Sequence, residues 1–142
     1  MAYHLSKDYQ VRSFKPRKKK KQYIKPKKKH VPTPKPENNI CTCGCGKSFG
    51  LSRHHVFYGK GQRDLSSEYG CVEALCWQSH QSSTGIHGSK SDCKFDFNLK
   101  RKHQQRLYDR GMIQSKFISL FGKDYLSMTF EDFIGIKLLE GR

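Results

Sequence analysis

The sequence predicts a small α+β domain, with more helix towards its C-terminus, preceded by a disordered basic segment. Three observations support this fold class. All five prolines lie before residue 40, together with 13 of the 28 Lys and Arg residues. Short apolar runs, which are typical of strands, follow between residues 40 and 76. Apolar residues at four-residue spacing, which are typical of a helix, lie in the segment after residue 95.

Residues 1–39 form the first predicted unit, a Lys- and Pro-rich arm with 13 basic and 2 acidic residues. Its lysine runs repel one another and its prolines disfavour a helix, so we expect this arm to be disordered. Such a charged segment attracts DNA phosphates, although a solubilising tail and a nuclear import signal are alternatives. The lysines expected to contact DNA are Lys18, Lys19, Lys20, Lys21, Lys27, Lys28 and Lys29.

The charge of the whole chain indicates its partners. The formal net charge is +16, and this excess makes nucleic acid, either single- or double-stranded DNA, the expected partner. The sequence has no long apolar run and no apolar stretch near its N-terminus that resembles a signal peptide. We therefore expect a cytoplasmic protein, with neither a membrane nor a small-molecule substrate as its partner.

Two short strands and one short helix are expected at the start of the second unit, residues 40–142. The strands are predicted over 40–57 and 70–76, because both segments contain short apolar runs. A short helix is predicted to follow from Trp77 to Gln81. Residues 82–94 are rich in Ser, Thr, Gly and Asp, a composition that predicts a loop.

Three helices are expected in the remainder of this unit. They are predicted over residues 95–110, 116–121 and 130–134. The first has apolar residues on one helical face and Gly111 after it as a stop signal. Ser115 is expected to cap the second helix. Thr129 and Asp132 have the spacing of a capping box, which predicts the start of the third.

Four of the seven histidines lie within a short window, and they form the candidate functional site. They are His54, His55, His80 and His87. Imidazole nitrogen binds divalent transition metals, and neutral histidine is a common general base near neutral pH. A metal-dependent phosphodiesterase needs both functions, because a metal stabilises charge on phosphate while a base takes a proton from water. The other three histidines are expected to be packed or surface residues.

The motifs around these histidines resemble those of phage HNH endonucleases, and more narrowly the recombination-enhancement proteins, which are RecA-dependent nucleases. The matching segments are residues 53–59, 63–66, 69–70, 75–80, 85–88, 99–100 and 121–126. This resemblance implies a ββα-metal fold of the treble-clef-like type and one divalent cation, Mn, Mg, Ni, Co or Zn. It also implies DNA phosphodiester hydrolysis in phage recombination or processing, within the bacterial host cell. A recombinase filament such as RecA is the implied protein partner.

The same resemblance assigns roles to individual residues. It makes His54, His80 and His87 the metal ligands and His55 the general base. The guanidinium groups of Arg53 and Arg63 are expected to contact phosphate, because they offer two parallel donors. The ligand set contains no carboxylate, which favours Mn, Co, Ni or Zn over Mg.

Two features of this sequence differ from the family pattern. The middle Asn of the HNH motif is missing, and Cys71 lies about where it is expected. In addition, His54 and His55 are neighbours on a predicted strand, and successive strand residues point to opposite faces. A shared site for both histidines therefore requires the strand to end, twist or bulge there.

The six cysteines suggest a second metal site rather than disulfides, because three of them are tightly bunched. The candidate ligands of a structural zinc are Cys41, Cys43, Cys45 and Cys76; alternatively, two of the first three bind it together with Cys76 and either Cys71 or Cys93. Ordinary buried thiols are the competing interpretation.

Two other function classes compete with the nuclease. One is a non-catalytic, zinc-containing DNA-binding module with a basic arm. The other is a basic RNA-binding or ribosome-associated protein. His55 separates the first of these from a nuclease, since a binding module needs no base beside a metal ligand.

Overall fold

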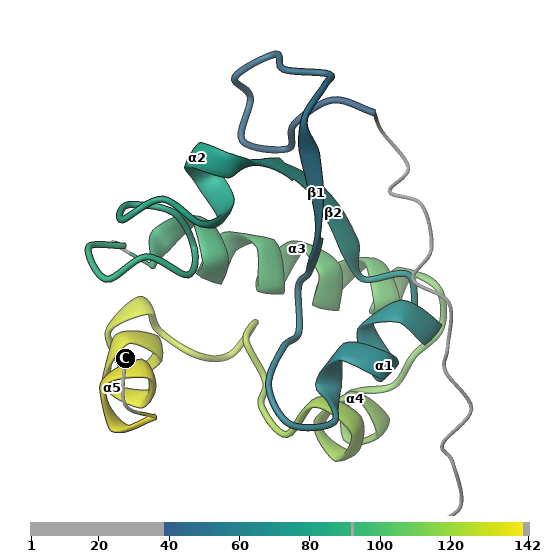
Figure 1. Ribbon diagram of the computed structural model, residues 1–142. Helices are drawn as coiled ribbons and strands as arrows, with labels where there is room; N and C mark the ends of the chain where they lie inside the picture. Colours follow the sequence, from purple (N-terminus) through teal and green to yellow (C-terminus); the bar gives the residue numbers. More distant parts are fainter. Residues whose placement is uncertain (1–38, 92, 141–142) are drawn as a thin grey trace, which may run out of the picture.

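The computed structural model describes residues 39–91 and 93–140. The predicted DNA-binding arm, apart from Asn39, lies outside these residues, as do all seven of its lysines singled out above. Within the described residues the fold is mixed α/β, with one two-stranded antiparallel sheet and five helices (Figure 1). The predicted α+β class is confirmed at this level.

The sheet consists of β1, Leu51–His55, and β2, Val72–Cys76. The register pairs Leu51 with Cys76 and His55 with Val72. The second strand was predicted almost correctly, but the expected strand over 40–57 is wrong in length. Residues 40–50 form turns and bends instead, and Gly44, Gly46 and Gly50 all have positive φ there, which interrupts a strand.

Helix α1, Gln62–Glu68, has no counterpart among the predicted elements. It contains one apolar residue, Leu65, so it lacks the periodic pattern of an amphipathic helix. Two buried serines attach it to the end of β1 instead. The Ser66 hydroxyl donates to the Phe57 carbonyl at 2.5 Å and accepts from the Phe57 amide at 3.1 Å.

The other four helices follow the predicted order. They are α2, Trp77–His80, α3, Lys94–Asp109, α4, Gln114–Phe121, and α5, Phe130–Leu139. Ser115 as the cap of α4 is wrong, because Ile113 is the N-cap and the helix starts one residue before Ser115. The capping box of α5 is confirmed by the Thr129 hydroxyl, which accepts from the Asp132 amide at 3.1 Å. Helix α5 extends past its predicted end.

Helix α3 crosses behind the two strands and connects the sheet to the C-terminal helices (Figure 1). Phe57, after β1, packs its ring against Phe117 and Phe121 of α4, with centroid distances of 5.6 and 4.4 Å. His103 of α3 is buried and its Nε2 lies 2.8 Å from a Glu73 carboxylate oxygen of β2. His103 is therefore a packed residue, as predicted. Among the described residues, no helix is long and apolar enough to cross a membrane.

Candidate metal centre

Three of the four predicted histidines converge at one point. His54 comes from β1, His80 from the last position of α2, and His87 from the loop that follows. One ring nitrogen of each lies within 4.8 Å of the others. The ring centroids are 5.1 Å apart for His54 and His80, 5.3 Å for His54 and His87, and 5.1 Å for His80 and His87. We call these three residues the histidine cluster.

Two nitrogens of this cluster are buried without a hydrogen-bond partner among the described residues. They are Nε2 of His54 and Nδ1 of His80. A buried polar atom without a partner costs about 1–3 kcal/mol, so folded proteins seldom leave one unsatisfied. A metal ion that accepts both lone pairs removes this cost. The donor set therefore fits a divalent transition metal, with His87 as a third and more exposed ligand.

Burial keeps the imidazoles of His54 and His80 neutral, which is the form that binds metal. Burial, together with the nearby charge of Lys100, lowers the pKa of His54 to about 3. Burial also lowers the pKa of His80. Because both values lie below the usual 6.5, these rings offer lone pairs at neutral pH.

Backbone hydrogen bonds hold the two later histidines together. The amide of His87 donates to the His80 carbonyl at 3.1 Å, and the neighbouring Ile86 amide donates to Ser79 at 2.9 Å. Gly88 makes this tight loop feasible, since a Cβ at that position would lie 2.2 Å from the carbonyl oxygen of Ser82. The predicted loop over residues 82–94 is confirmed up to position 91; the chain enters α3 at position 94.

His55 is not part of the histidine cluster. Its Nε2 lies 3.0 Å from the Ser67 hydroxyl of α1, whereas the His54 ring packs against His80 and His87. Strand β1 ends at His55, which is one of the ways in which the two histidines could share a site. The alternation of side chains along the strand nevertheless separates the His54 ring from the His55 ring. Burial, and then the charge of Arg63, lowers the pKa of His55, so its imidazole is also neutral near pH 7.

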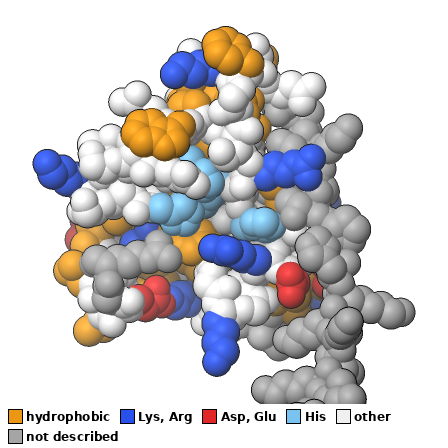
Figure 2. Space-filling model, viewed as in Figure 1, with side chains coloured by type: hydrophobic (Ala, Val, Ile, Leu, Met, Phe, Trp, Pro, Cys, Tyr) orange, Lys and Arg blue, Asp and Glu red, His pale blue; other side chains and the backbone are white. Residues whose placement is uncertain are grey.

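The surface around the histidines is positively charged. Pale-blue histidine side chains gather at the centre of one face, with Lys and Arg side chains around them (Figure 2). Arg53 and Arg63, the two predicted phosphate contacts, are both exposed. An anionic strand would meet cationic side chains on this face.

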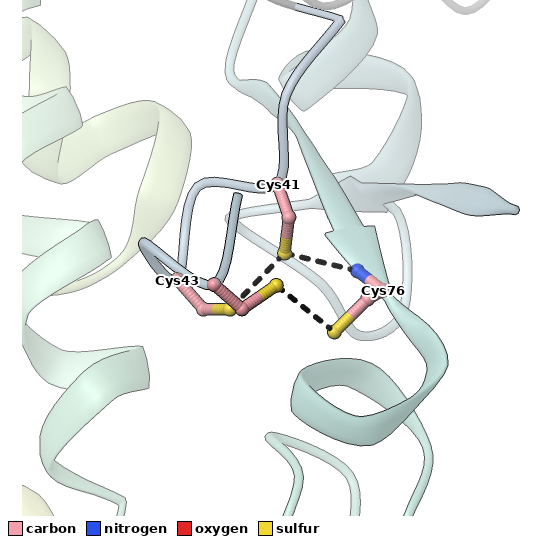
Figure 3. Close-up of side chains that lie close together, drawn as sticks. Cys41, Cys43 and Cys76 are labelled. Carbon is pink, nitrogen blue, oxygen red and sulfur yellow. Dashed lines mark hydrogen bonds between the residues drawn. The ribbon is translucent and has the colours of Figure 1, made fainter. Parts of the chain in front are cut away.

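The four predicted zinc ligands lie together near the start of α2. The sulfurs of Cys41, Cys43, Cys45 and Cys76 all lie within 4.8 Å of one another. Figure 3 shows Cys41 and Cys43, on the loop before β1, beside Cys76 at the end of β2. The sulfurs of Cys41 and Cys43 are 3.2 Å apart, and those of Cys45 and Cys76 are 3.9 Å apart. We call these four residues the cysteine cluster.

The alternative ligands Cys71 and Cys93 do not belong to this cluster. The sulfur of Cys71 lies 3.8 Å from the Tyr69 carbonyl, and that of Cys93 lies 3.6 Å from the Ser91 carbonyl. Within the cluster, a hydrogen bond with Ser79 lowers the pKa of Cys76 to about 6. A thiolate is therefore accessible at neutral pH, and thiolate is the form that binds zinc.

A buried charged network lies beside the histidine cluster and was not predicted from the sequence. Asp96 of α3 accepts from Lys100 at 2.5 Å, from Lys137 of α5 at 2.5 Å and from the Tyr58 hydroxyl at 2.6 Å. The Tyr58 ring lies 4.9 Å from the His87 ring and 5.7 Å from the His54 ring. These residues come from three distant segments, so no local motif marks them. Tyr58 connects the network to the histidines.

Comparisons with models of protein families, with curated proteins and with solved structures find no significant match to this chain. The function is therefore argued from the two clusters and their surroundings.

Proposed function

We propose that this protein is a metal-dependent DNA endonuclease of the HNH type. The convergence of His54, His80 and His87, with two buried nitrogens that lack hydrogen-bond partners among the described residues, supports this most directly. A site with three imidazole ligands suits Mn, Co, Ni or Zn better than Mg. The positive charge of the chain supports DNA as the substrate.

His54, His80 and His87 would hold a divalent cation, which would supply positive charge to stabilise a phosphodiester in its transition state. The protein's own residues do the remaining work. His55, neutral and adjacent to His54 in the chain, takes the proton from the attacking water. Arg53 and Arg63, both exposed, bind phosphates of the DNA strand.

The arrangement of the ligand-bearing elements is compatible with a ββα-metal fold. Strands β1 and β2 are antiparallel and α2 follows β2 directly, so His54 and His80 lie on the first and third of these elements. The place of Asn in the HNH motif is taken by Cys71, which is buried beside the sheet. Phage recombination and a recombinase partner such as RecA follow from the sequence resemblance alone.

We also propose that the cysteine cluster binds a structural zinc ion. Four sulfurs within 4.8 Å of one another match the ligand number and type of structural zinc sites. The cluster joins the loop before β1 to the end of β2 at the start of α2. Zinc would therefore stabilise the fold rather than act in the reaction.

The alternative function is a non-catalytic, zinc-containing DNA-binding module. The cysteine cluster and the net charge of +16 are sufficient for that function. They leave unexplained the histidine cluster and the neutral His55 next to His54 in the chain, which a binding module does not need.

Cleavage assays distinguish the two functions. Purified protein is incubated with single-stranded and double-stranded DNA across a panel of Mn, Mg, Ni, Co and Zn. We expect nicking that depends on the metal, and a loss of roughly 10²–10⁴-fold in rate for His55→Ala with DNA affinity unchanged. DNA binding without cleavage under any metal would favour the binding module, and full activity of His55→Ala would remove His55 from the mechanism.

A further inference from the structure

A cavity of about 520 Å³ lies beside the histidine cluster, between the loop that carries His87 and helix α5. His87 forms part of its wall, so any group held there lies next to the candidate metal. The volume falls within the range of roughly 300–1,000 Å³ that is typical of small-molecule sites. Nothing in the histidine or cysteine clusters requires this cavity.

The walls of the cavity are preformed on both sides. On the loop side, Gly88 is folded so tightly that a Cβ would lie 2.2 Å from the carbonyl oxygens of Ser82 and Ser83. On the helix side, Ile134, Lys137 and Leu138 lie at spacings that place them on one face of α5. The cavity therefore does not have to be created by its ligand.

The chemistry of the lining combines apolar surface with positive charge. Ile86, Ile134 and Leu138 supply apolar surface, and Ser89 supplies a hydroxyl group. Lys137 lines the cavity as a buried ammonium. Its partner Asp96 is also paired with Lys100, as described above, so one buried carboxylate lies between two cations at this wall of the cavity.

A nucleotide matches these properties, because its base has two apolar faces and a polar edge while its phosphate is an anion. A base inside a duplex is paired and stacked, and it enters such a cavity only after it has left the helix. We propose that this cavity receives one unpaired base of a DNA strand next to the phosphodiester at the histidine cluster. This site, which rests on the nuclease function proposed above, would give the enzyme a preference for unpaired DNA.

The proposal is tested by binding, which does not depend on cleavage. The full-length protein is titrated, with no divalent metal added beyond what it retains on purification, into labelled poly-dT of about ten nucleotides and into an abasic oligomer with the same backbone. Phosphate contacts, including those of the arm, are common to both oligomers and cancel in the ratio of the two affinities. We expect the oligomer with bases to bind roughly fivefold to twentyfold more tightly.

Two variants on α5 locate the effect. Leu138 lines the cavity and is 67 % exposed, whereas its neighbour Leu139 does not line it and is 89 % exposed. Because both side chains are largely exposed, a Glu at either position leaves the hydrophobic core intact. Leu138→Glu and Leu139→Glu therefore add the same charge at neighbouring positions, one inside the cavity lining and one outside it. We expect the affinity ratio to fall by about threefold or more in Leu138→Glu and to stay unchanged in Leu139→Glu.

The same ratio of affinities for the two oligomers in the native protein, Leu138→Glu and Leu139→Glu would overturn the base site, even if the protein proves to be a nuclease. Conversely, a ratio that falls only in Leu138→Glu supports the site even if no metal yields cleavage. Cleavage of the same oligomers across the metal panel tests the proposed nuclease function separately.

Discussion

Cys76 and His80 lie at opposite ends of one helical turn. Cys76 is the N-cap of α2 and a member of the cysteine cluster, and His80 is the last residue of α2 and a member of the histidine cluster. The His80 carbonyl in turn accepts from the amide of His87. The position of this short helix therefore determines where His80 and His87 lie. Metal binding at one cluster should in consequence change the metal affinity of the other.

We expect Cys45→Ser to weaken metal binding at the histidine cluster, although Cys45 is not one of its ligands. Cys45 is exposed, so the substitution removes a sulfur without disturbing the core. Loss of zinc would release the start of α2, which positions His80. The affinity for Co²⁺ at the histidine cluster should therefore fall roughly 10-fold to 100-fold, which is the effect of removing a residue that orients a metal ligand. Titration followed by the visible spectrum of imidazole-bound Co²⁺ measures this affinity.

Cys93→Ser is the matched control, because Cys93 lies outside the cysteine cluster and should leave the Co²⁺ affinity unchanged. Equal affinities in the native protein, Cys45→Ser and Cys93→Ser would mean that α2 does not couple the two clusters.

The buried His54 predicts a loss of stability in mild acid when no metal is bound. Its pKa is about 3 in the folded protein, whereas the unfolded chain has an ordinary value near 6.5. Between these values the unfolded state binds a proton that the folded state does not. The free energy of unfolding should therefore fall as the pH drops from 6.5 towards 3, by roughly 1.4 kcal/mol per pH unit from this residue.

Urea denaturation in EDTA between pH 7 and pH 5 measures this effect, in a range above the titration of ordinary carboxyl groups. His54→Gln serves as the comparison, because it keeps a neutral polar side chain that does not titrate. The variant should lose less stability than the native protein over this range. Parallel pH dependences in the two proteins would show that His54 is charged or exposed in the folded state.

The basic arm provides a prediction that separates DNA binding from chemistry. Residues 1–39 carry 13 basic side chains but none of the four candidate site histidines. Deleting them should weaken DNA binding by orders of magnitude at low salt, and the slope of log K against log salt should shrink by about 0.9 per lost phosphate contact on duplex DNA. Cleavage at saturating DNA should remain. An unchanged slope would show that the arm does not contact DNA, whereas loss of cleavage at saturation would show that it contributes to the active site.

The sequence predicted much of the metal centre because histidine and cysteine are chemically distinctive. A metal site among the clustered histidines, and the grouping of Cys41, Cys43 and Cys45 with Cys76, could be expected from residue type and spacing, whereas the choice of His54, His80 and His87 as the ligands rested on the family resemblance. The apolar pattern likewise located β2 and α3. For β2 and α3 a local signal in the chain was sufficient.

The features that were missed depend on contacts between distant segments. Helix α1 is held by the buried hydroxyl of Ser66 rather than by an apolar stripe, so its pattern resembles that of a loop. The loop over 40–50 contains apolar residues, but its shape follows from the glycines and from the cysteines that meet Cys76. Tyr58 and Asp96 meet only once α3 crosses behind the sheet.

The metal content of a His54→Ala, His80→Ala double variant tests the histidine centre most directly. Elemental analysis should find one metal ion for each of the two clusters in the native protein. The double variant should lose the ion of the histidine cluster and all cleavage together, His87→Ala should show an intermediate loss of both, and His4→Ala should match the native protein. Full metal stoichiometry in the double variant, with its fold verified by circular dichroism, would contradict a metal centre at these histidines.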